Sequence, residues 1–218
     1  MKKLYFGEIL GTFALIFIGC TVAVLSGNLL TTALAFGTTV VVMSYTIGHL
    51  SGGHFNPVVS LAMAVKKKIT WNDFLHYILA QFVGGIFGIL AVYVITHDQN
   101  GLGSNLVSAL SSSESISIFI GLFTEILVTF FFIFVILMVQ SKQELEKFAG
   151  LIIGITLSLL ILVAGPVTNA SLNPIRSLAP ALIEFGKPLE QLWIFILGPT
   201  VGSLLAVFVY NFVPQDES

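Results

Sequence analysis

The segment "GGHFNPVVSLA", residues 52–62, places a helix-start signal inside a long apolar run. Residues 29–65 contain no Asp, Glu, Lys or Arg, yet their middle holds a glycine pair, a histidine and an Asn-Pro dipeptide. Asn caps the free N–H groups of a helix start, and Pro at the first helical position loses no needed donor. The sequence therefore predicts a short helix that begins at Pro57, in the middle of the run.

A second copy of this signal lies in "TNASLNPIRSLAPA", residues 168–181. Asn56 and Asn173 are 117 positions apart, since 173 − 56 = 117, and the same offset pairs Glu8 with Glu125. It also pairs several glycines, and it aligns "NPVVSLAMA" with "NPIRSLAPA". One Asn-Pro alone is most simply a kink in a packed helix. Two copies at one repeat offset favour a pair of short helices, Pro57 and Pro174 being their first residues.

The composition is that of a membrane protein. Of the 218 residues, 9% are charged and 56% are hydrophobic, and the mean hydropathy is +0.99, whereas about a quarter of the residues of an ordinary soluble domain are charged. The single cysteine, Cys20, excludes a disulfide within the chain.

A bilayer core needs about 20 apolar residues per helix. Six segments are long enough: about 4–26, 32–51, 74–96, 116–139, 148–166 and 191–212.

The apolar sequence left around Asn56-Pro57 and around Asn173-Pro174 is too short for further crossings. Each of these two segments is therefore expected to form a re-entrant half-helix. The predicted fold is an all-α membrane protein with six transmembrane helices and two re-entrant half-helices. Residues 1–218 form one channel domain, with a first repeat at about 1–97, a Gly/Ser/Asn-rich linker at about 98–115 and a second repeat at about 116–218. Each half has three spans, so the second copy is inverted, and inverted repeats place the functional site near the bilayer midplane.

The lysines predict the orientation. Lys2, Lys3, Lys142, Lys147 and the cluster 66–68 flank the membrane on one predicted side, whereas the loops at 26–31 and 97–115 contain no Lys or Arg. By the positive-inside rule, both termini are expected to lie in the cytoplasm of a multi-pass protein of the cell membrane.

The two signatures, "ALAFG" followed by "GHLSGGHFNP" and then "GPVTNASLNPIRS", together with the opening "E-x-x-G-T-F", resemble the aquaporin or major intrinsic protein family along nearly the whole chain. The resemblance implies a bacterial-type water channel without a cofactor or bound metal. It also implies a homotetramer with one pore per subunit, in contact with membrane lipid and not with nucleic acid. Close packing of such helices is permitted by the glycines of "FVGGIFGILA", residues 82–91.

The resemblance also assigns roles to residues. The amides of Asn56 and Asn173 are implied to donate to a passing water oxygen, and Arg176 to stand at the outer constriction. A salt bridge from Arg176 to Glu184 is the structural alternative. The other filter positions carry over as Phe36, Ile161 and Ala170. On sequence alone, Phe36 and Ile161 fit lipid-facing or core positions equally well.

Four further polar residues receive roles outside the filter. Glu8 and Glu125 are equivalent carboxylates inside spans, which an enzyme would use as acid and base and a transporter as proton carriers. The resemblance implies instead that each binds backbone N–H groups of a re-entrant loop. His54 is expected in the cytoplasmic vestibule, and His49 in helix packing.

Two departures from the family pattern concern the pore. The usual Asn-Pro-Ala is replaced by Asn-Pro-Val at Val58 and by Asn-Pro-Ile at Ile175, and both replacements add bulk where the half-helix tips meet. Two outcomes remain open, altered packing between the tips or encroachment on the lumen. Ile161 stands where water-selective members typically have His, while Ser177 and Phe195 match the water-channel pattern.

The predicted function is a passive channel for water, with small neutral solutes as additional candidates, that excludes protons and ions. The first alternative is a glycerol facilitator. From other classes, a secondary transporter would use Glu8 and Glu125 as its ion site, and a structural protein would have a lumen plugged by Val58 and Ile175. The sequence shows no metal cluster, nucleophile–base pair or phosphate loop, so we do not expect an enzyme.

Overall fold

A computed structural model of the chain describes residues 2–97 and 101–214. Six of its helices are long and apolar enough to cross a membrane. They are α1 (Lys2–Ser26), α2 (Leu29–Ser51), α4 (Trp71–Thr96), α5 (Glu114–Gln140), α7 (Ala149–Thr168) and α10 (Leu192–Tyr210), the last span being counted from Lys187. The shorter helices are α3 (Pro57–Val65), α6 (Gln143–Glu146), α8 (Pro174–Glu184) and α9 (Lys187–Glu190). The six predicted spans are confirmed, with ends that differ by a few residues.

The long helices pack in the same way in each half of the chain. α1 packs on α4 and α2, α5 packs on α10 and α7, and the pair α2 and α7 joins the halves. Glycines allow the closest approaches: a Cβ on Gly84 would lie 2.3 Å from the carbonyl oxygen of Ile9, and one on Gly202 would lie 2.4 Å from that of Ile126. Since Gly84 and its neighbours face α1 and α8, the glycines of residues 82–91 serve packing between helices of the same chain.

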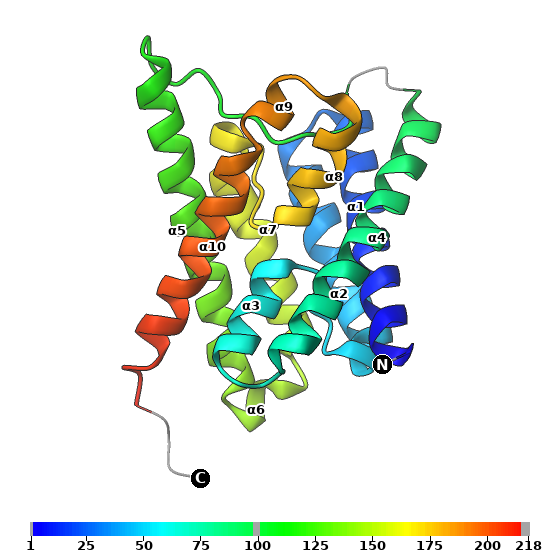
Figure 1. Cartoon of the computed structure of the whole chain (residues 1–218), viewed down its shortest axis with the longest axis vertical. Coiled ribbons are helices and arrows are strands. Elements are labelled where there is room, and N and C mark those ends of the chain that lie inside the picture. Colours follow the sequence, from blue (N-terminus) through cyan, green and yellow to red (C-terminus); the bar gives the residue numbers. More distant parts are fainter. Residues whose placement is uncertain (1, 98–100, 215–218) are drawn as a thin grey trace.

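The half-helices α3 and α8 occupy the middle of the bundle. In Figure 1, α3 runs from the centre towards the lower side and α8 towards the upper side. Asn56 and Asn173 have extended backbone as N-caps, and the preceding Phe55 and Leu172 have positive φ angles of 49° and 53°. These left-handed residues turn the chain sharply, so that each half-helix begins where the other does.

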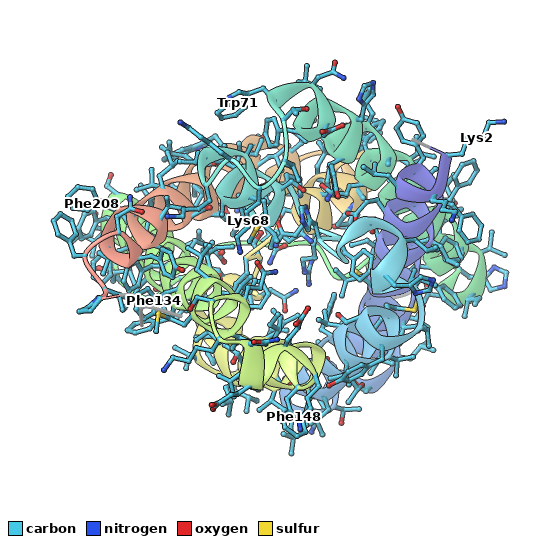
Figure 2. The ribbon with its side chains drawn as sticks, turned by 90° about the horizontal axis from the view of Figure 1, so that it is seen from below. Lys2, Lys68, Trp71, Phe134, Phe148 and Phe208 are labelled. Atoms are coloured by element: carbon cyan, nitrogen blue, oxygen red, sulfur yellow. The ribbon has the colours of Figure 1, made fainter. Side chains whose placement is uncertain are left out.

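Apolar side chains cover the outside of the bundle, as expected of a surface that faces lipid. Trp71, Phe148 and Phe208 are 58%, 47% and 60% exposed. In the view from below they project outwards from the helices, while Lys68 lies nearer the centre (Figure 2). The segments that carry the flanking lysines, at the start of α1, between α3 and α4, and on either side of α6, all lie at this lower side (Figure 1).

The linker does more than connect the two halves. Its first residues, 98–100, lie outside the described part of the chain, and its last two belong to α5. Between them it packs onto the second half: the Ser108 N–H donates to the Val167 carbonyl at 2.8 Å, and the Val107 N–H donates to the Gln191 side chain at 2.9 Å. The linker therefore forms a cap on the side of the molecule that carries α8.

Candidate functional site

The two Asn-Pro asparagines bind reciprocally across the centre of the molecule. The Asn56 amide nitrogen donates to the Leu172 carbonyl at 2.7 Å, and the Asn173 amide nitrogen donates to the Phe55 carbonyl at 2.9 Å. Each side-chain oxygen accepts the N–H two residues further along its own helix, at 3.1 and 3.0 Å. Since an amide nitrogen has two N–H donors, each asparagine keeps one without a partner in the described part of the chain.

The loop before α3 is held by Glu8. One carboxylate oxygen accepts the Ser51 hydroxyl at 2.6 Å and the His54 N–H at 3.0 Å, and the other accepts the Phe55 N–H at 2.8 Å and the Gln81 side-chain amide at 2.7 Å. Glu8 itself is fully buried. Its four hydrogen bonds therefore fix the backbone that carries the Phe55 carbonyl to Asn173.

Glu125 holds the loop before α8 in the equivalent way. It accepts the Thr168 hydroxyl at 2.6 Å, the Ser171 N–H at 2.9 Å and the Leu172 N–H at 3.0 Å. In the second repeat the position equivalent to Gln81 is 198, which is a glycine and offers no side-chain donor. A Cβ built at this position would lie 2.8 Å from the Cβ of Glu125. The two halves thus use equivalent carboxylates with different numbers of donors.

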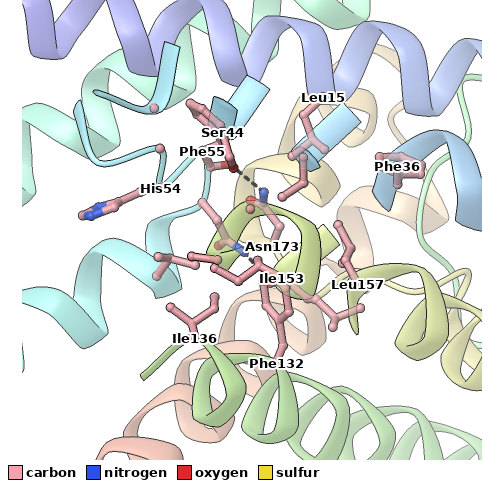
Figure 3. Close-up of a pocket in the computed structure, with 18 of the residues that line it drawn as sticks. Leu15, Phe36, Ser44, His54, Phe55, Phe132, Ile136, Ile153, Leu157 and Asn173 are labelled. Atoms are coloured by element: carbon pink, nitrogen blue, oxygen red, sulfur yellow. Dashed lines mark hydrogen bonds between the residues drawn. The ribbon is translucent and has the colours of Figure 1, made fainter. Parts of the chain in front are cut away.

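One cavity of about 430 Å³ runs along the half-helix tips and contains both asparagines. Two helices each place three residues one turn apart on its wall: Phe36, Val40 and Ser44 from α2, and Ile153, Leu157 and Ile161 from α7. Leu15 of α1 and Phe132 of α5 complete an apolar wall opposite the amides (Figure 3). The cavity is therefore amphipathic, with amide donors on one side and aliphatic and aromatic carbon on the other.

The four predicted filter residues belong to this one cavity, and two of them are in direct contact. Phe36, Ile161, Ala170 and Arg176 all line it, and all are buried. The Arg176 guanidinium carbon lies 5.2 Å from the centroid of the Phe36 ring, a cation–π arrangement. The Phe36 ring lies against α1, where a Cβ on Gly19 would come within 2.3 Å of it.

Arg176 is anchored by the linker. Its Nη1 donates to the Gly103 carbonyl at 2.7 Å and to Asn105 Oδ1 at 2.9 Å. Glu184, the alternative partner considered for this arginine, instead accepts the N–H of Leu102. The Arg176 charge is thus satisfied by neutral oxygens, and one edge of the guanidinium stays on the cavity wall.

Asn105 is a residue that sequence reasoning missed. It is 2% exposed, and its side chain accepts from Arg176 and from the Ser177 hydroxyl at 2.8 Å, while donating to the Thr168 carbonyl at 3.0 Å. Its only signal in the sequence is an asparagine within a Gly/Ser-rich segment, which reads equally well as a solvated loop. Its position depends on how the linker folds back onto α8.

The bulky residues after the two prolines lie outside the lumen. Val58 is 1% exposed and Ile175 is 4% exposed, and neither belongs to the cavity wall. The Cγ2 atom of Ile175 lies 2.5 Å from the place that a Cβ on Gly85 would occupy, so this side chain fills the space over a glycine of α4. Of the two outcomes left open by the sequence, encroachment on the lumen is not what the cavity lining shows, and Ile175 packs against Gly85 of α4 and not against the other half-helix tip.

The two histidines near α3 have different surroundings. His54 is buried and lines the cavity, but its imidazole stacks on Tyr77 at 4.4 Å and its Nδ1 lies 3.0 Å from Ser60 Oγ. In Figure 3 the ring points away from Asn173. His49, expected in helix packing, is instead exposed and lines the end of the cavity away from Arg176, together with Gln140 and Glu146.

Comparisons with known proteins agree on one family. A family model described as major intrinsic protein matches residues 1–210. The chain is 43% identical over 219 residues to "Glycerol uptake facilitator protein-like 6" of Lactiplantibacillus plantarum, with 100% of both chains covered. It is 40% identical over 216 residues to "Aquaporin Z" of Brucella melitensis, with 94% of each covered. The X-ray structure of the aquaglyceroporin from Plasmodium falciparum superposes with a TM-score of 0.84 at 26% identity, over 97% of this chain and 96% of that one.

Proposed function

Because this chain belongs to the major intrinsic protein family, we propose that it is a passive membrane channel for water and small neutral solutes. The observation that carries the proposal is the cavity that holds two uncommitted amide N–H groups opposite an apolar wall, with Arg176 at one end. A neutral molecule that accepts hydrogen bonds replaces its lost water contacts there, whereas an ion does not.

Asn56 and Asn173 are the groups that we propose to orient a passing water molecule. Each amide is fixed by the opposite loop and by its own helix, so its remaining N–H has a defined direction. A water oxygen that accepts from both asparagines turns its hydrogens away from the helix tips. Both helix N-termini also carry partial positive charge at this point, which disfavours cations.

We propose that the end of the cavity lined by Phe36, Ile161, Ala170 and Arg176 is the selectivity filter. Arg176 supplies a fixed donor, while Phe36 and Ile161 supply apolar surface on two other sides, and the small Ala170 leaves room. Such a filter admits water and also offers carbon surface to a short polyol. Glycerol is therefore the second solute for which permeation is worth measuring, and a glycerol facilitator is the second candidate function.

The setting that we propose is the cell membrane, with both termini in the cytoplasm. The lysine-bearing side holds the start of α1 and the end of α10 (Figure 1), which agrees with the positive-inside rule. Membership in this channel family supports the further proposals of a homotetramer in contact with membrane lipid, of water and small neutral solutes as the molecules that pass, and of no enzymatic activity.

Two features favour a channel over the rival classes. A coupled transporter requires an accessible ion site, but Glu8 and Glu125 are fully buried, are absent from the cavity wall and accept hydrogen bonds from the re-entrant loops. A plugged lumen requires Val58 or Ile175 inside it, and neither lines the cavity.

Stopped-flow light scattering on proteoliposomes tests the proposed function. Vesicles with the protein are expected to shrink faster than empty vesicles in an impermeant gradient, with a rate linear in the gradient and insensitive to ion gradients. Shrinkage no faster than in empty vesicles would contradict the proposal, and a saturable or ion-driven flux would favour the transporter. Re-swelling in glycerol separates a water-selective channel from a facilitator, and Ile161→His, which narrows the filter, is expected to suppress any glycerol flux.

A further inference from the structure

The inverted repeat relates the filter to a second group of cavity residues at the other end. The offset of 117 pairs Phe36 with Ile153 and Ile161 with Ser44, and it pairs Ala170 with Gly53 and Arg176 with Val59. All eight residues line the same cavity. Phe36 and Ser44 lie two turns apart on α2, about 12 Å along its axis at a rise of about 1.5 Å per residue. Each filter residue thus has a counterpart that lines the lumen on the opposite side of the asparagines.

The four counterparts, Ser44, Gly53, Val59 and Ile153, are here called the inner ring, and close packing brings α2, α7 and the loop before α3 together beside it. A Cβ on Gly48 would lie 3.9 Å from the Cβ of Ser44 and 4.0 Å from the Cα of Gly53, which places α2 next to the loop before α3. A Cβ on Gly150 would lie 2.9 Å from the Cβ of Ser44. Ile153 lies one turn further along α7 from this contact, so both helices meet at the inner ring.

The chemistry of the inner ring differs from that of the filter in one respect. The filter has a charged donor in Arg176, whose counterpart Val59 is apolar, as is Ile153. Ser44 is only partly buried, and its hydroxyl forms no hydrogen bond within the described part of the chain. Ser44 lies two turns of α2 away from Phe36, so the serine stands apart from the filter. Within the inner ring, the side-chain group able both to donate to and to accept from a solute is the Ser44 hydroxyl.

We propose that the inner ring is a second solute-contact site and that Ser44 is its specificity-determining residue. This inference rests on the proposed channel function and deepens it. A water molecule or a solute hydroxyl that leaves the asparagine pair towards His49 binds the Ser44 hydroxyl, between the apolar side chains of Val59 and Ile153. The ring therefore selects small neutral hydroxylated molecules by one hydrogen bond and by width, whereas the filter uses a fixed charge.

The test compares variants at Ser44 in proteoliposomes, with permeability divided by the amount of protein inserted. Ser44→Ile gives the inner ring the side chain of its repeat counterpart Ile161 and is expected to lower water permeability at least about fivefold by narrowing the lumen. Ser44→Ala removes one hydrogen bond and is expected to lower water permeability by about threefold, with glycerol flux, where wild type shows it, falling at least as far. Ser44→Thr keeps the hydroxyl and is expected to stay closer to wild type than Ser44→Ala.

Thr46 provides the matched control. It lies on the same helix, it is exposed, its hydroxyl bonds to the Val42 carbonyl, and it does not line the cavity. Thr46→Ile is expected to leave permeability unchanged. The proposal is overturned if the Ser44→Ile and Ser44→Ala proteins, inserted to equal amounts, match wild type, or if Thr46→Ile lowers permeability as much as Ser44→Ile. Failure of the wild-type protein to conduct water would instead refute the proposed function, so the two outcomes are separate.

Discussion

Ile175 packs its Cγ2 methyl group over Gly85, so the isoleucine that follows Asn173-Pro174 fills a gap between α8 and α4 and leaves the lumen free. A Cβ at position 85 would stand 2.5 Å from this methyl group, well inside van der Waals contact. The unusual residue after the proline is therefore matched by a glycine on another helix. The pair explains how a bulky side chain is accommodated at a half-helix tip.

Gly85→Ala tests this match. Overpacking of a dense core costs about 1–3 kcal/mol, so we expect a lower midpoint of thermal unfolding in detergent. The double variant Gly85→Ala with Ile175→Ala is expected to recover much of the loss, because the smaller side chain frees the space. Gly48→Ala is the matched control, since a Cβ there meets its nearest neighbours at 3.9 Å. Equal midpoints for the Gly85→Ala and wild-type proteins would refute the match.

Glu125→Gln tests the role of the carboxylate in holding the second loop. Glutamine has one acceptor oxygen where glutamate has two. Its NH2 group, itself a donor, must therefore face either the Leu172 N–H or the Ser171 N–H and the Thr168 hydroxyl. A buried donor left without an acceptor costs about 1–3 kcal/mol. We expect a lower unfolding midpoint and lower water permeability per inserted channel. Glu190→Gln, an exposed change on α9, is the control, and equal effects of the two substitutions would contradict this role.

Asn105→Leu tests the linker as an anchor of the filter. The substitution keeps a similar size but removes the acceptor of Arg176 Nη1 and of the Ser177 hydroxyl. With fewer anchors the guanidinium departs from its place over Phe36, and we expect the ratio of glycerol to water permeability to rise by about threefold, the value of one lost hydrogen bond. Stopped-flow assays with both gradients measure the ratio. Leu106→Asn, an exposed change next to it, is expected to leave the ratio unaltered.

Asn173→Asp tests the reciprocal amide pair. The aspartate keeps an oxygen for the Ile175 N–H but turns a second oxygen towards the Phe55 carbonyl, which the amide nitrogen contacts at 2.9 Å. The new charge also faces the lumen. We expect reduced thermal stability and a measurable cation leak through proteoliposomes, read with a potassium- or proton-sensitive dye. Asn211→Asp, exposed and bonded to Lys66, should show neither effect. Intact ion exclusion in the Asn173→Asp protein would count against the proposed role of the amide.

The spans and half-helices were readable from the sequence because their signals are local. About 20 apolar residues are needed for a crossing whatever surrounds them, and Asn-Pro starts a helix through its own side chain and ring. The confirmed six spans and the helix starts at Pro57 and Pro174 follow from such signals. The repeat offset added the pairing of the two halves, because it compares the chain with itself.

What the sequence by itself determined is thus the set of elements and the membrane class of the fold, together with the family to which the signatures point. The tertiary structure decided how side chains from distant segments meet. In the folded chain, Ile175 packs against Gly85, Asn105 of the linker accepts a hydrogen bond from Arg176, and His49 lines the cavity. These contacts depend on the direction of a side chain and on the path of a loop, and both are fixed by packing between helices far apart in the chain. A local pattern of residue types does not predict that packing.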